Sequence, residues 1–307
     1  MSNDFPSNLD FPQALSATDG THTPMHLRVR HLTRFAYADV ARDSCNDVRL
    51  CPITDGCQKM ISFDLRVRPS VLVMTYHDFC LNRVDHFEIP EPHSTMEVES
   101  ITVVETYTDA RGAVPADLPL DSLSGPDATE NFYDFLSDTA FVSLEPEIWR
   151  EAVDVLPEGV RHLWLDSVKL GEHIYRSFRY LPRSTNAHTK MIEVLRSREG
   201  VCQDFAHVML AMCRSQGIPA RYVSGYFYNE NRHPGEIEAS HAWVEIFLPG
   251  YGWKGYDPTH CRLVDTRYIK LAVGRDYADI RPVNGTFRGR GTLSMTVEVR
   301  ITRESPP

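Results

Sequence analysis

The chain has 307 residues, which is long enough for two domains, and its hydrophobic content of 42% is ample for ordinary cores. Its formal net charge of −10 and the lack of a basic run argue against nucleic-acid binding, which needs concentrated Lys and Arg. The first 24 residues have no basic start followed by an apolar stretch, so we expect neither a signal peptide nor a membrane helix there. The expectation is a cytoplasmic protein with no membrane partner and a disordered segment at residues 1–24.

Strand patterns recur from residue 25 to residue 110. Stretches such as HLRVRH, MISFDLRV and TMEVESITVVETY are rich in β-branched residues, and Pro, Asp and Gly separate them. This pattern predicts an antiparallel, β-sandwich-like domain over 25–110. Residues 111–127 are rich in Pro, Asp and Ser and are predicted to be a linker.

The cysteines of this first region do not have the spacing of a metal site. Cys45, Cys51 and Cys57 are evenly spaced, whereas structural zinc sites usually need close Cys pairs and a fourth ligand. The chain has seven Cys in all, an odd number that fits reduced thiols better than a disulfide framework. We therefore expect no metal and no other cofactor.

Helical patterns follow the linker and lead to a conspicuous cysteine. Apolar residues predict helices over 146–156 and 161–178, and then over 203–215 within GVCQDFAHVMLAMC, where Gly217 ends the run. Cys202 would therefore begin a buried helix. The unpaired amides and the dipole at a helix N-terminus stabilise a thiolate.

Two strands are predicted after this helix. The stretch from His241 to Leu248 alternates between two faces, the loop PGYG follows, and a second short strand ends at Asp257 before Pro258. An antiparallel hairpin of this kind would place His241 beside Asp257. A final alternating stretch, residues 293–301, predicts another strand, whose sheet the sequence does not assign.

Cys202, His241 and Asp257 together indicate nucleophilic catalysis. A thiol is the strongest side-chain nucleophile near neutral pH, an imidazole can take its proton, and a carboxylate can orient that imidazole. Each residue alone would be interpreted as structural, as Cys213 is, because a Cys in an apolar helix is usually a small buried hydrophobe. Their order and local patterns favour a catalytic triad.

Two neighbours of the predicted triad have other interpretations. His207 lies five residues beyond Cys202, so it projects about 140° away around the helix and is expected to support the helix rather than to act in catalysis. Trp243 shares a strand face with His241 and is either a wall of the substrate groove or part of the core.

Several motifs resemble those of bacterial transglutaminase-like proteins, of the group often named "putative cysteine proteases". They are GVCQDFAH, ARYVSGY, ASHAWVE, YDPT and AVGRDYADIRPVNGTF, while HLTRFAYADV, NDVRLCP and Asn82 resemble the family's N-terminal β domain. Leu81 stands where the family usually has Gly, and Cys51 where a basic residue is common. The resemblance implies an α+β fold with a papain-like core over 128–307, in which a Cys-bearing helix packs on an antiparallel sheet. It also implies Cys202 as nucleophile, His241 as general base and then acid, and Asp257 as the residue that orients His241.

This chemistry begins with attack on a peptide or isopeptide amide and gives a thioester at Cys202. Water would resolve the thioester in a peptidase or amidohydrolase, the outcome we favour, and an amine would resolve it in a transamidating transglutaminase. A non-catalytic binding or scaffold protein with this fold is a third possibility. The backbone N–H of Cys202 is expected to hold the oxyanion with a second donor that the sequence does not identify. The oligomeric state is not indicated.

Overall fold

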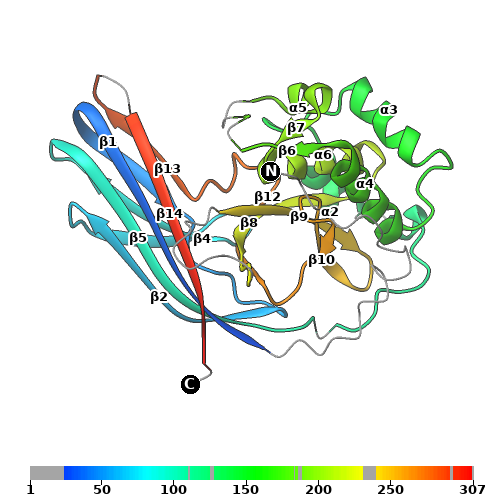
Figure 1. Ribbon diagram of the computed structural model, residues 1–307, viewed down its shortest axis with the longest axis horizontal. Coiled ribbons are helices and arrows are strands. Elements are labelled where there is room, and N and C mark those ends of the chain that lie inside the picture. The colour runs from blue at the N-terminus through cyan, green and yellow to red at the C-terminus, as the bar shows by residue number, and fades with distance from the viewer. Residues whose placement is uncertain are drawn as a thin grey trace, which may run out of the picture.

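The computed structural model describes residues 24–109, 111–124, 128–182, 184–185, 189–230, 240–290 and 293–305. Figure 1 shows a β domain beside an α+β domain, so the expected fold class is confirmed. The segment that was predicted to be disordered lies, apart from residue 24, outside the described residues. Among the helices that the structure describes, none combines the length and apolar character needed to cross a membrane.

The β domain is built around one long strand, β1. In the order of the sheet, its strands are β2 (Gln58–Arg68), β5 (His93–Thr106), β1 (Met25–Val48), β4 (Arg83–Ile89) and β3 (Val73–His77), with β13 (Val283–Arg288) and β14 (Leu293–Glu304) also paired to β1. The first half of β1 pairs with β5 and β14, and its second half pairs with β4 and β13. A register shift between Ala36 and Ala41 separates the halves. Apolar residues from both halves contribute to one core cluster, which gives the domain its sandwich-like character.

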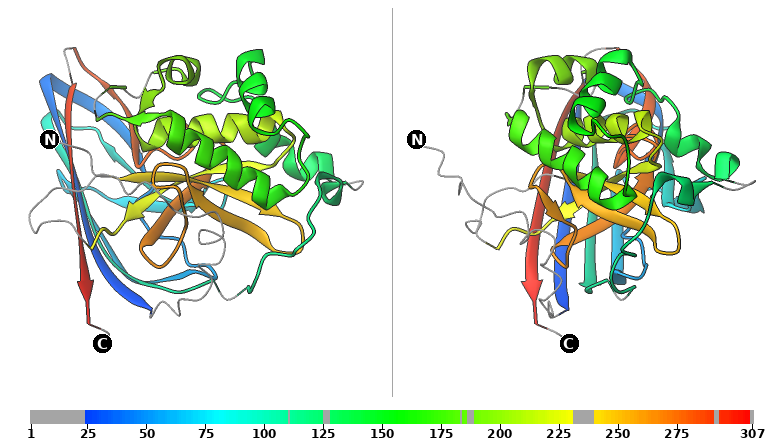
Figure 2. Two further views of the ribbon diagram at one scale, coloured as in Figure 1. Left: turned by 45° about the vertical axis from the view of Figure 1, so that its right-hand side comes forward. Right: turned by 90° about the vertical axis from the view of Figure 1, so that its right-hand side faces the viewer.

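The C-terminal strand, whose sheet the sequence did not assign, belongs to the β domain. Residues of β14 pair with β1 along almost its whole first half, from His26 opposite Glu304 to Tyr37 opposite Leu293. Figures 1 and 2 show the two strands side by side over their length. The predicted unit of 128–307 therefore includes two strands, β13 and β14, that complete the N-terminal sheet. Alternation predicts that a strand exists, but it carries no information about which sheet the strand joins.

The α+β domain consists of an antiparallel sheet with helices on one face. The sheet has the order β11 (Arg262–Leu263), β10 (Gly252–Asp257), β9 (His241–Leu248), β8 (Ala220–Phe227) and β12 (Tyr268–Gly274). The helices are α2 (Ala128–Leu136), α3 (Pro146–Val155), α4 (Leu163–Ser177), α5 (Met191–Ser197) and α6 (Cys202–Ser215), with a 3₁₀ turn η1 (Leu120–Leu123) and a small pair of strands, β6 (Arg179–Tyr180) and β7 (Glu199–Gly200). The helices predicted over 146–156, 161–178 and 203–215 are confirmed by α3, α4 and α6.

Helix α6 is the centre of this domain. It packs on β8 and β9, and α3, α4 and α5 surround it. Its residues from Asp204 to Arg214 are all buried, because neighbours cover the helix on every side. Figure 2 shows the helices on one face of the sheet and the β domain towards the other. Tyr226, Ile269 and Leu271 on that other face belong to the core cluster of the β domain.

Two amide side chains of the β domain bind the backbone of β12. Asn82 donates from Nδ2 to the carbonyl of Val273 and accepts from its N–H at Oδ1, both at 2.8 Å. Gln58 makes the same pair of bonds with Lys270, also at 2.8 Å each. Strand β12 is an edge strand, and these amides bind its outward-facing backbone groups at the domain boundary, where the Lys270 carbonyl also accepts a hydrogen bond from the Ile53 N–H at 3.1 Å.

The turn before Asn82 has an unusual residue for its conformation. Leu81 has φ +62°, in the left-handed region, and its side chain is 78% exposed. Asp78 stabilises the turn, because its Oδ1 accepts hydrogen bonds from the backbone N–H groups of Cys80 and Asn82 at 3.0 Å. Glycine adopts this conformation without steric cost, and this explains why related proteins usually have Gly where this chain has Leu81.

Candidate active site

Cys202 is the first residue of α6, as the sequence predicts, and its side chain is half-buried. The preceding turn is held by Asp204, whose Oδ2 accepts hydrogen bonds from the Val201 N–H at 2.8 Å and from the Thr185 hydroxyl at 2.6 Å. A Cβ at Gly200 would lie 2.8 Å from that of Asp204, so this approach requires glycine. The first-turn amides of α6, including that of Cys202, have no partner within the helix and are positioned to hold an anion.

His241 begins β9, and its imidazole connects the other two predicted residues. Its side chain is 9% exposed, and Nε2 lies 2.8 Å from Oδ2 of Asp257. The Cys202 side chain interacts with the same imidazole and contributes to its raised pKa. Because Nε2 is bonded to Asp257, Nδ1 is the ring nitrogen that is left for the thiol. The structure therefore brings Cys202, His241 and Asp257 together in the order of a triad.

Asp257 ends β10 and is fully buried. Its Oδ2 accepts hydrogen bonds from His241, from His260 Nδ1 at 2.7 Å and from the Tyr268 hydroxyl at 2.7 Å. Its Oδ1 accepts from the backbone N–H groups of Thr259 at 2.8 Å and His260 at 3.3 Å. Five donors fix this carboxylate, so it can hold the His241 ring in one orientation.

The electrostatics of the pair favour a charged imidazole. Burial alone would lower the pKa of His241, but the charge of Asp257, the hydrogen bond to it and the interactions with Cys202 outweigh burial and raise the pKa to about 10. Burial would raise the pKa of Asp257, but the charge and hydrogen bond of His241, followed by those of His260, hold it well below its ordinary value. An imidazolium beside a thiol is the arrangement that activates cysteine nucleophiles.

His260 and Tyr268 are site residues that sequence reasoning missed. His260 stands three residues after Asp257 in YDPTH, and this spacing was a local signal that could have indicated it. Tyr268 begins β12, at the opposite edge of the sheet from β10 and β11, and no local pattern connects it to Asp257. Phe227 packs against both rings, with centroid distances of 4.7 Å to His260 and 4.8 Å to Tyr268.

The residues expected to be structural near the triad are buried. His207 is 2% exposed, stacks on Phe141 and accepts a hydrogen bond from the Tyr277 N–H at 3.3 Å, and burial lowers its pKa to about 4. Cys213 is fully buried. Trp243 is 1% exposed and packs with Val223, Tyr268 and Val273, so of its two interpretations the structure supports the core.

Two further features of the described residues lie apart from the triad. A pocket of about 310 Å³ is found at the domain boundary, and its walls include Asn82, Val273 and Asp279 but no triad residue. The evenly spaced Cys45, Cys51 and Cys57 are exposed, buried and half-buried respectively, and Cys45 lies near His86 and Glu88 rather than beside the other two. At the triad, His241, Asp257 and His260 bring donor atoms within 4.8 Å of one another, and hydrogen bonds already join them.

Comparison with protein families gives two matches. The model of the transglutaminase-like superfamily matches residues 166–258, a range that includes Cys202, His241 and Asp257. The model of the bacterial transglutaminase-like N-terminal region matches residues 27–105, which covers most of the five strands β1 to β5.

Relatives and solved structures extend the likeness over nearly the whole chain. An uncharacterized protein of Mycobacterium leprae is 32% identical over 281 residues, covering 90% of this chain and 98% of that protein. An uncharacterized protein of Mycobacterium tuberculosis is 34% identical over 314 residues, with 91% and 93% covered. The crystal structure of a "putative cysteine protease" from Cytophaga hutchinsonii has the same fold, with a TM-score of 0.73, 22% identity and coverage of 93% of this chain and 92% of that one. The chain therefore belongs to the transglutaminase-like superfamily and carries the N-terminal region of its bacterial members.

Proposed function

We propose that this protein is a cysteine-dependent enzyme that transfers the acyl group of peptide or isopeptide amides through a thioester at Cys202. The observation that carries the proposal is the 2.8 Å hydrogen bond between His241 and the buried carboxylate of Asp257, together with the interaction of Cys202 with the same imidazole that helps to raise its pKa. This arrangement sets a nucleophile at a helix N-terminus beside a base, and the base against a carboxylate held by further donors.

The steps follow from these positions. The thiolate of Cys202 attacks the amide carbonyl carbon and forms a C–S bond, and the carbonyl π electrons move to oxygen, where the N–H of Cys202 stabilises the charge. The imidazolium of His241 then donates its proton to the amine nitrogen, the C–N bond breaks and a thioester remains. Neutral His241 next takes a proton from the attacking group, and collapse of the second tetrahedral adduct returns the thiolate and the imidazolium.

Water or an amine can be that attacking group. We favour hydrolysis, because water needs no binding site of its own, and therefore a peptidase or amidohydrolase. Transamidation is the alternative. A protein-glutamine gamma-glutamyltransferase of Pseudomonas aeruginosa is 39% identical to this chain over 69 residues, which are 21% of this chain and 10% of that protein. This limited match supports an amine as the alternative group that attacks the thioester.

A binding or scaffold protein with the same fold would not need this arrangement. Burying Asp257 and His241 together costs desolvation, and five hydrogen bonds to the carboxylate offset that cost. A half-buried thiol at the end of this network serves catalysis and adds little to folding.

The test is a screen of peptide libraries with the full-length protein, with and without a primary amine, followed by mass spectrometry of the products. Hydrolysed amides without amine support a peptidase or amidohydrolase, and amine adducts support a transglutaminase. The Cys202→Ala protein should melt at the wild-type temperature and give no product, while Cys57→Ser should be as active as wild type. Product formation by folded Cys202→Ala would contradict the proposal.

A further inference from the structure

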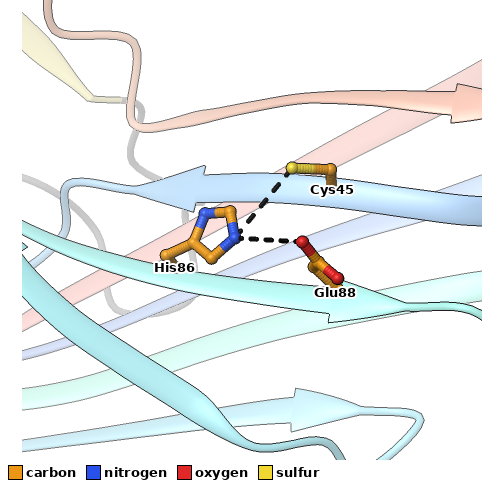
Figure 3. A group of neighbouring side chains, drawn as sticks. All are labelled: Cys45, His86 and Glu88. Atoms are coloured by element: carbon orange, nitrogen blue, oxygen red, sulfur yellow. Dashed lines mark hydrogen bonds and ion pairs between the residues drawn. The ribbon is translucent and has the colours of Figure 1, made fainter.

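Three side chains with metal-binding chemistry meet on one face of the β domain. Cys45 on β1 lies directly opposite Glu88 on β4, and Asp47 lies directly opposite His86 in the same antiparallel pair. Residues two apart in a strand point to the same face, so these four side chains share one surface. Figure 3 shows the thiol, the imidazole and the carboxylate of Cys45, His86 and Glu88 turned toward one another.

These three side chains are joined only by long contacts, a sulfur hydrogen bond and an ion pair. His86 Nε2 lies 4.0 Å from the Cys45 sulfur and 3.7 Å from the nearer Glu88 oxygen, and all three donor atoms lie within 4.8 Å of one another. Ordinary hydrogen bonds to nitrogen and oxygen are shorter. A tetrahedral zinc with Zn–S of about 2.3 Å and Zn–N of about 2.0 Å places sulfur and nitrogen about 3.5 Å apart, which is about 0.5 Å closer than the 4.0 Å between Cys45 and His86.

A carboxylate behind the imidazole fixes its tautomer. Asp47 Oδ1 lies 2.8 Å from His86 Nδ1, and Asp47 also interacts with the Tyr76 hydroxyl. An imidazole that donates Nδ1–H to a carboxylate presents an unprotonated Nε2, and this is the usual outer-shell arrangement of histidine ligands in metal sites. Nε2 is the atom that faces Cys45 and Glu88.

We propose that Cys45, His86 and Glu88 form a binding site for a zinc-class transition-metal ion, with Asp47 as the residue that orients His86. One thiolate, one imidazole and one carboxylate suit zinc, and three protein ligands leave the fourth position to water. The Glu88 side chain is 65% exposed, so an ion can enter from solvent.

The site would join two strands at the point where β1 changes partners. Cys45 follows the last pair of β1 with β5, Ala41 opposite His93, and His86 and Glu88 lie on the next partner, β4. A bound ion would therefore clamp β1 to β4. The clamp lies in the β domain, whereas the triad lies on α6, β9 and β10, so it goes beyond the proposed acyl transfer and does not depend on it.

The test uses the full chain with Cys202→Ala, because this background removes the thiol of the triad from metal chemistry. Cobalt(II) is titrated anaerobically with a phosphine reductant, and the near-ultraviolet thiolate-to-cobalt band is recorded. The proposal predicts one cobalt per chain with this band, and loss of the band when zinc is added. No thiolate band at saturating cobalt, or a band that zinc does not displace, would overturn it.

Variants locate the ion. Adding Cys45→Ser should remove the band, and adding His86→Gln should weaken cobalt and zinc binding by at least about 100-fold. Asp47→Asn should weaken it by about 10–100-fold, as loss of outer-shell partners does. The matched control, Cys57→Ser, removes another thiol of the same domain and should bind within about twofold of the parent. A band that survives Cys45→Ser would place the ion elsewhere and contradict the proposal, and circular dichroism confirms that each variant is folded.

Discussion

Nδ1 of His260 lies 2.7 Å from Oδ2 of Asp257, as close as the 2.8 Å that separates His241 Nε2 from the same oxygen. One buried carboxylate oxygen therefore serves two imidazoles. His241 also reaches Cys202, whereas the ring of His260 packs on Phe227. Loss of the Asp257 carboxylate and loss of His260 should consequently change the turnover rate to different extents. The comparison distinguishes the group that orients His241 from the group that only supports the carboxylate.

Asp257→Asn should lower the turnover rate by on the order of 10⁴-fold, as loss of the orienting carboxylate does in other triads. The loss should be smaller than that of Cys202→Ala, because the nucleophile remains. The charge of Asp257 also raises the pKa of His241, so the alkaline limb of the pH–rate profile should move down from about pH 10 towards neutral pH. Steady-state rates from pH 5 to pH 11 measure both effects. A wild-type rate and profile would mean that another group orients His241.

His260→Ala should lower the rate by only about tenfold, because Asp257 keeps its charge, the Tyr268 hydroxyl and two backbone donors. The alkaline limb should stay near pH 10, since the charge that raises the pKa of His241 is retained. The same pH series tests this variant beside Asp257→Asn. If the alkaline limb of the pH–rate profile moved down as far as it does in Asp257→Asn, His260 would control the charge of the His241–Asp257 pair.

Stability should fall on the alkaline side because of His241. Its pKa in the folded protein is raised to about 10, against an ordinary value near 6.5 in the unfolded chain. The ion pair with Asp257 thus contributes fully below about pH 6.5, and its contribution is lost as pH rises through about 10. Urea unfolding at pH 6, 8 and 10 measures this loss. His241→Gln should show a shallower decline over the same range, and an equal decline would assign the loss to other groups.

Leu81→Gly should stabilise the protein by about 0.5–1 kcal/mol, because glycine adopts the observed φ of +62° without steric cost. The exposed Leu81 side chain contributes little packing that could be lost. The matched control is Leu81→Ala, which keeps a Cβ and should give no gain. Urea unfolding of the three proteins provides the comparison, and a destabilised Leu81→Gly would contradict the conformational argument.

The sequence predicts the local structure of the site well. The start of α6 at Cys202, the start of β9 at His241 and the end of β10 at Asp257 all agree with the structure, because each depends on residues close in the chain. Helical periodicity, strand alternation and the glycines of the loop PGYG carry that information.

Contacts that depend on sheet order could not be predicted in this way. Tyr268 reaches Asp257 from the far edge strand, and β14 returns to pair with β1 across most of the chain. No local pattern encodes either relation, since strand order and register are set by packing of the whole sheet. The catalytic roles, the peptide or amide substrate, the independence of the acyl transfer from cofactors and the cytoplasmic location stay predictions.

The reactivity of Cys202 tests the central claim most directly, and it needs no knowledge of the substrate. The native protein is treated with iodoacetamide at pH 6 for increasing times, and the labelled thiols are mapped by mass spectrometry. If His241 holds a thiolate at the N-terminus of α6, Cys202 should be labelled at least about tenfold faster than any other cysteine, and His241→Ala should remove this advantage. Labelling of Cys202 that is no faster than that of the exposed Cys45, or that is unchanged in His241→Ala, would contradict the triad.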